Sequence, residues 1–150
     1  MYLLTKEGVV HNDIERPNHY DKAGVDIRVE PKDLVRLLGF DLGNVCKYLF
    51  RYKWKNGQQD LDKAREYLSW IRSDSSCILH VDPKTGMTIY FLTKIFLMDK
   101  AKYHPALVRI LQGLHDGCNE YFNLFDCVAA VSDAFRILNK DKKNETTAAS

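Results

Sequence analysis

The sequence has little net charge, no long apolar run and no leader-like start. Its 22 Lys and Arg residues nearly balance its 20 Asp and Glu residues, which leaves a net charge of +2. Any attraction for phosphate must therefore come from a local cluster of charge, and we do not expect nucleic acid as a partner. The longest apolar run, Ile89–Met98, covers about ten residues and contains Lys94, so it is too short to span a membrane. We expect a cytoplasmic protein with no membrane partner, because no charged and then apolar leader opens the chain.

Metal-binding patterns are absent as well. The four cysteines form no C-x-x-C pair and no zinc-like repeat: Cys46, Cys77, Cys118 and Cys127. Three histidines share no metal-binding spacing with carboxylates: His80, His104 and His115. We therefore predict no metal ligands, and we read the cysteines as free thiols in a reducing compartment.

The familiar catalytic motifs are missing too. The sequence has no P-loop of the form G-x-x-x-x-G-K-[ST], no H-E-x-x-H, no G-x-S-x-G, no EF-hand loop and no dinucleotide-binding fingerprint. A protein with this sequence that transfers phosphoryl groups must do so without the usual phosphate-binding loop.

What the sequence does contain is typical of a globular protein. Hydrophobic residues make up 45% and charged residues 28%, and no low-complexity linker divides the chain. We predict one mainly α domain over residues 1–150, a compact helical bundle built on an antiparallel helical hairpin. Residues 77–139 should form a helical extension and residues 141–150 a disordered polar tail. A broad apolar stripe expected on a last helix at 120–138 suggests a homo-oligomer.

One segment allows two interpretations. The run Asp82-Pro83-Lys84-Thr85-Gly86 is rich in turn formers and could join Cys77–Val81 and Met87–Phe91 into a short β-hairpin. Apolar residues at helical spacing instead predict a helix from Thr88 to Lys102, which we favour. Pro105 should open the next helix, whose core face carries Leu107, Ile110, Leu111 and Leu114.

The helical hairpin is expected between Gly43 and Leu68. In its first helix an amide and three cations lie at steps of three, four and four, which places them on one face: Asn44, Lys47, Arg51 and Lys55. Asn56-Gly57 then favours a turn, because both residues tolerate the left-handed conformation. In the second helix an apolar stripe of Leu61, Ala64, Leu68 and Ile71 lies beside a polar face with Asp60, Lys63 and Tyr67.

Three segments in and before this hairpin resemble a known family. They read Pro17-x-His19-Tyr20, then Gly43-Asn44-x-x-Lys47-Tyr48-x-x-Arg51, then Lys55-Asn56-Gly57 followed by Asp60-Leu61-x-Lys63-Ala64-x-x-Tyr67. Over roughly residues 16–72 the pattern resembles a small bacteriophage domain whose best-characterised relatives are described as phage nucleotide kinases. The resemblance implies a phosphate-binding core in this region and a location in the host cytosol.

The resemblance also implies a reaction and a set of site residues. The expected reaction is phosphoryl transfer from a nucleoside triphosphate to a deoxynucleoside monophosphate such as dTMP or dGMP. Magnesium could arrive with the nucleotide, although no ligands for it are indicated. His19, Lys47 and Arg51 are the expected catalytic residues, because proton donation and convergent positive charge suit this chemistry. The expected ligand-binding residues are Tyr20, Asn44, Tyr48, Lys55, Asn56, Asp60, Lys63 and Tyr67.

Other functions remain open on the sequence. A non-catalytic binder, or sponge, of a nucleotide or nucleotide-derived signal would use the same basic face without turnover. A DNA-binding helix-turn-helix and a purely structural oligomer are further alternatives. If the basic face binds phosphate, Arg51→Ala should weaken nucleotide binding and leave folding intact, because Arg51 is expected on a polar face.

Overall fold

The computed structural model describes residues 28–73, 81–118 and 124–149. The described residues from Pro31 onward form one compact unit. His19 and Tyr20 lie outside the described residues, so their expected roles stay predictions.

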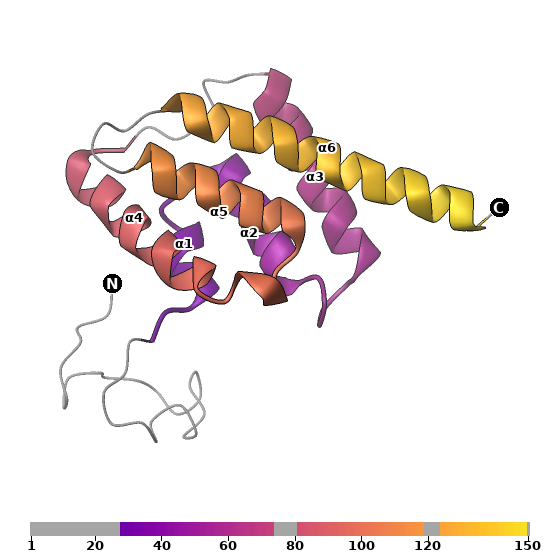
Figure 1. Cartoon of the computed structure of the whole chain (residues 1–150), viewed down its shortest axis with the longest axis horizontal. Helices are drawn as coiled ribbons and strands as arrows, with labels where there is room; N and C mark the ends of the chain where they lie inside the picture. The colour runs from indigo at the N-terminus through magenta and orange to yellow at the C-terminus, as the bar shows by residue number, and fades with distance from the viewer. Residues whose placement is uncertain (1–27, 74–80, 119–123, 150) are drawn as a thin grey trace. The chain divides into compact units, whose positions relative to one another are not determined.

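The described residues form helices and contain no β-strand. This confirms the predicted mainly α fold, a helical bundle that includes an antiparallel hairpin. The helices are α1 (Pro31–Val35), α2 (Phe40–Arg51), α3 (Gln58–Ser73), α4 (Pro83–Leu97), the 3₁₀ helix η3 (Lys100–Lys102), α5 (Pro105–Gly117) and α6 (Leu124–Ala149). In Figure 1, α6 lies beside α5, and it also contacts α3.

The second segment of the possible β-hairpin, Met87–Phe91, is not a strand, because it lies inside α4. Residues 77–80 of its first segment lie outside the described residues. The favoured helix is present, but it begins at Pro83 rather than Thr88 and ends at Leu97 rather than Lys102. The Asp82 side chain accepts a hydrogen bond from the Thr85 backbone N–H (2.8 Å), and Pro83 occupies the first helical position. This N-cap turns the expected turn sequence into the start of a helix.

The last helix also differs from the prediction. We expected a helix ending near Leu138 and a tail at 141–150, whereas α6 continues to Ala149. Asp141 lies 3.2 Å from the Nε2 atom of His104, and the Lys142 ammonium lies 3.9 Å from Asp62. These contacts with α3 and with the start of α5 favour helical backbone in a segment that is polar by sequence.

The core is formed by the apolar faces that the helical spacing predicts. On α5, the four expected core residues Leu107, Ile110, Leu111 and Leu114 are all buried. On α3, Ala64, Leu68 and Ile71 are fully buried, and on α2 the same holds for Val45 and Cys46. Burying these stripes leaves the opposite faces of α2 and α3 exposed to solvent, and the candidate site lies there.

Candidate functional site

Helix α2 is amphipathic, with a buried apolar face and a more exposed face of polar and aromatic residues. Its buried residues include Leu42, Val45, Cys46, Leu49 and Phe50. The opposite face is exposed or partly exposed, and its residues follow helical spacing: Phe40, Asn44, Lys47, Tyr48 and Arg51. The Asn44 side chain donates to the backbone carbonyl of Phe40 (2.8 Å), so this amide serves its own helix.

Helix α3 runs antiparallel to α2 and adds its own side chains to the same surface. Arg51, at the end of α2, contacts Asp60 in the first turn of α3, whereas Phe40, at the start of α2, contacts Tyr67 further along α3. Lys63, Tyr67 and Trp70 follow one another on α3 at steps of four and three, which is one helix face.

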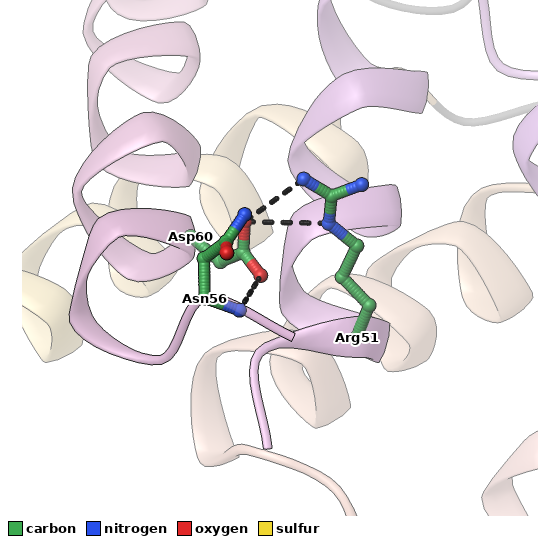
Figure 2. A network of polar contacts seen from close by, with 3 residues as sticks. All are labelled: Arg51, Asn56 and Asp60. Atoms are coloured by element: carbon green, nitrogen blue, oxygen red, sulfur yellow. Dashed lines mark hydrogen bonds and ion pairs between the residues drawn. The ribbon is translucent and has the colours of Figure 1, made fainter. Parts of the chain in front are cut away.

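A buried ion pair joins the two helices at the turn. The Arg51 Nη2 and Nε atoms donate to Asp60 Oδ1 at 3.1 and 3.3 Å, and the Asn56 backbone N–H donates to Oδ2 at 3.1 Å. Figure 2 shows the carboxylate of Asp60 held between these two groups. Asp60 is fully buried, whereas 31% of the Arg51 side chain is exposed. Asp60 therefore positions Arg51 and closes the turn.

The pKa of Asp60 reflects these partners. Burial by itself raises the pKa of a carboxyl group, but the hydrogen bonds from Arg51 and Asn56 and the charges of Arg51 and Lys63 oppose it. The net result is a pKa below the usual value of an aspartate. Asp60 is therefore ionised at neutral pH and poorly suited to accept a proton from a substrate.

Three cations surround one tyrosine ring. The Lys47 ammonium lies 4.6 Å, the Arg51 guanidinium 4.9 Å and the Lys63 ammonium 5.4 Å from the centroid of the Tyr48 ring. We call Lys47, Tyr48, Arg51, Lys63 and Asp60 the Tyr48 cluster. Because Asp60 balances a single positive charge, the cluster keeps an excess of two. Such an excess attracts anions.

Aromatic rings continue from this cluster along the surface. The ring of Tyr67 lies nearly parallel to that of Tyr48, with centroids 6.0 Å apart. Phe40 and Trp70 each meet the Tyr67 ring edge to face, at 5.8 and 4.9 Å. Phe40 is 73% exposed and Trp70 46% exposed, so both present apolar area to solvent. A cationic and an aromatic surface therefore adjoin each other.

Phe40 and Trp70 were missed by our sequence analysis. The hairpin was expected to begin at Gly43, whereas α2 begins three residues earlier, at Phe40. Their spacing could have placed both residues on the polar faces: Phe40 precedes Asn44 by four residues, and Trp70 follows Tyr67 by three.

A groove lies beside Lys63 between α3 and α6. It has a volume of about 420 Å³ and is lined by Asp62, Lys63, Arg65, Glu66 and Ser69 of α3 and by Phe135 of α6. This volume falls in the range of small-molecule sites. Since Lys63 belongs both to the groove and to the Tyr48 cluster, a ligand in one lies next to the other.

Lys55 and Asn56 do not extend the cluster in the way the sequence suggested. Helix α2 ends at Arg51, and residues 52–57 form a turn in which Gly57 has a φ of 51°. Lys55 is therefore an exposed turn residue rather than the next cation on the helix face. Asn56 contributes its backbone N–H to Asp60.

Within the part of the chain that the structure describes, no group of three or more His, Cys, Asp or Glu side chains is placed to hold a metal ion. None of its helices combines the length and the apolar character needed to cross a membrane.

Comparison with known proteins connects part of the chain to a family. Residues 14–69 match the model of a family described as a protein of unknown function, DUF3310. This segment includes all five residues of the Tyr48 cluster and ends one residue before Trp70. No curated protein and no solved structure matches the chain. This similarity carries no activity with it.

Proposed function

We propose that the protein binds a nucleotide on the α2–α3 surface and transfers a phosphoryl group to a deoxynucleoside monophosphate. The observation that carries the binding proposal is the excess positive charge of the Tyr48 cluster beside exposed aromatic rings. A nucleotide carries both matching groups, a phosphate and a flat base.

The phosphate would lie among Lys47, Arg51 and Lys63. Lysine ammonium groups act as point charges, whereas a guanidinium can donate two parallel hydrogen bonds to a phosphate. Asp60 already occupies the Nε and Nη2 atoms of Arg51, which fixes the orientation of the guanidinium. The two lysines are then the residues whose charge is available to a ligand.

The base would lie against the aromatic rings. Stacking of a base on an aromatic side chain contributes roughly 1–3 kcal/mol and depends little on which base it is. Tyr67 is flanked by Phe40 and Trp70, so a base on this surface would have apolar contacts from both helices. The choice of dTMP or dGMP as acceptor rests only on the resemblance of the sequence to the phage nucleotide kinases.

Phosphoryl transfer also needs room for a donor. The groove between α3 and α6 shares Lys63 with the Tyr48 cluster, so a nucleoside triphosphate there would bring its phosphates to the same cations. Positioning and charge neutralisation supply most of the catalysis in such reactions. Magnesium would enter bound to the triphosphate.

A non-catalytic binder is the second candidate, and one observation favours it. Asp60 has a lowered pKa and is held by Arg51 and Asn56, so it is not a general base. A nucleotide sponge would need the same charge and the same rings without any proton transfer.

The test is an incubation of the protein with ATP and each deoxynucleoside monophosphate, with and without magnesium, read by mass spectrometry. We expect a new diphosphate with the wild type and at least a tenfold loss in Lys47→Ala, since a charged hydrogen bond contributes about 1.5–3 kcal/mol. Lys94→Ala is the matched control, because Lys94 is an exposed lysine on α4, away from the cluster.

Each outcome decides between the candidates. A nucleotide that is retained unchanged, and lost in Lys47→Ala, identifies a binder. If the protein shows no turnover and retains no nucleotide, the proposal is overturned. Equal losses in Lys47→Ala and Lys94→Ala would show that total charge matters rather than the cluster.

A further inference from the structure

The turn between α2 and α3 presents a tryptophan between two lysines. Lys53, Trp54 and Lys55 are all exposed, and 67% of the Trp54 surface is accessible. We call these residues the Lys-Trp-Lys turn. Its backbone is held by three hydrogen bonds of 2.9–3.1 Å, from the N–H groups of residues 54 and 55 to the Arg51 carbonyl and from Gly57 to the Tyr52 carbonyl. The indole ring is therefore exposed on a turn whose shape is fixed before any ligand arrives.

A second basic segment lies against this turn. The Lys53 ammonium donates to the backbone carbonyl of Lys102 at 2.8 Å, which joins the turn to η3 although 49 residues separate the two in sequence. Lys100 and Lys102 are exposed, and Asp99 pairs with Lys102 at 3.1 Å. Residues 52–57 and 99–102 together carry four lysines and one aspartate. This local excess of positive charge is hidden in the overall value of +2.

We propose that this surface binds single-stranded nucleic acid. A single strand offers unpaired bases at intervals along a chain of phosphates, and proteins bind it by stacking bases on aromatic rings within a basic surface. In the Lys-Trp-Lys turn an exposed lysine precedes the tryptophan and another follows it, and the Lys53 ammonium lies on the side of η3. A base stacked on Trp54 would thus bring its two neighbouring phosphates towards Lys53 and Lys55, and the strand would continue towards Lys100.

Two other polyanionic partners fit less well. In a duplex the bases are paired and stacked, so Trp54 would find no free base face without unstacking a step. A lipid surface carries negative charge but binds stably through a broad apolar face. Here Trp54 is exposed on residues 52–57, and Met98, which lies just before residues 99–102, is 82% exposed; the two side chains do not make a broad apolar face. Of the three partners, single-stranded nucleic acid is the one that can contact both the exposed ring, through an unpaired base, and the dispersed lysines, through its phosphates.

The experiment measures the anisotropy of a fluorescently labelled 20-nucleotide single strand titrated with the full chain. Trp54→Ala should weaken binding about tenfold, because stacking on one ring is lost. The double variant Lys55→Ala, Lys100→Ala should reduce the slope of log affinity against log salt by about 1.4, since each lysine that contacts phosphate contributes about 0.7. Circular dichroism verifies that both variants are folded, and Lys94→Ala should bind as the wild type does.

Competing assays separate this surface from the nucleotide site. An excess of dTMP should leave the oligonucleotide bound, because the mononucleotide is expected at the Tyr48 cluster. Full displacement by dTMP would overturn the proposal, as would unchanged affinity in both turn variants. Equal or tighter binding to a duplex of the same length, or to anionic vesicles in place of the oligonucleotide, would overturn it as well.

Discussion

At the scale of single residues, Arg51 has two roles. It neutralises the fully buried carboxylate of Asp60, and it lies beside the Tyr48 ring with Lys47 and Lys63. The sequence places Arg51 on a polar face, which predicts that Arg51→Ala leaves folding intact. The structure changes that expectation, because the substitution would leave a buried carboxylate without its cationic partner.

We therefore predict that Arg51→Ala lowers the free energy of unfolding by about 1–3 kcal/mol, the usual effect of leaving a buried polar group unpaired. Lys47→Ala should change it by less than about 0.5 kcal/mol, since its side chain is partly exposed and lies over the Tyr48 ring, which is itself partly exposed. Urea denaturation followed by circular dichroism measures both. A change below 0.5 kcal/mol in Arg51→Ala would contradict the structural role of this arginine.

At the scale of helices, the spacing of apolar residues was sufficient to predict which faces are buried. The same spacing placed Lys47 and Arg51 on a polar face of the first helix and Lys63 on a polar face of the second, and the structure brings all three to the Tyr48 ring. Helix ends were predicted less well. The early end of α2 at Arg51 moved Lys55 off the helix, and the Asp82 cap moved the start of α4. The burial of Asp60 depends on the packing of α2 against α3, which a residue pattern does not specify.

One glycine fixes how closely two helices approach. A Cβ atom built at Gly43 of α2 would lie 2.8 Å from the backbone carbonyl oxygen of Val35 at the end of α1. We predict that Gly43→Ala lowers the free energy of unfolding by about 1–3 kcal/mol, because the backbone itself must shift. Thermal unfolding measures the effect.

Gly57→Asn is the matched control for Gly43→Ala. Nothing lies within 4 Å of a Cβ at Gly57, and asparagine tolerates its φ of 51°. We expect a change of less than about 1 kcal/mol there. If the two glycine variants were equally destabilised, close helix contact at Gly43 would not be the cause.

At the scale of the whole molecule, His104 connects the start of α5 to α6. Its Nδ1 atom accepts a hydrogen bond from the Ala106 backbone N–H at 3.0 Å, so the proton of the neutral ring lies on Nε2, which faces Asp141. Burial lowers the pKa of His104 below 6.5; Asp141 opposes this shift, and the charge of Lys53 adds to it. The folded state therefore favours the neutral imidazole.

The sign of the pH effect follows from that shift. A group whose pKa is lower in the folded state contributes stability above its unfolded pKa and loses it as the pH falls below 6.5. We predict that the unfolding temperature falls between about pH 7.5 and pH 5.5, and that it falls less in His104→Asn, which keeps a side-chain acceptor for the helix N-terminus. Identical pH profiles for the two proteins would exclude His104 as the source.

Helix α3 makes two sets of contacts, and the sequence separation between the contacting residues differs greatly between them. Its contacts with α2 close a loop of nine residues at Arg51 and Asp60, whereas Arg72 of α3 reaches the Phe135 ring of α6, at 4.3 Å, across most of the remaining sequence. Short loops close at lower entropic cost and sooner than long ones. During synthesis on the ribosome, the α2–α3 surface with its Tyr48 cluster can thus assemble before α6 has been made. The groove beside Lys63 is completed only when α6 docks.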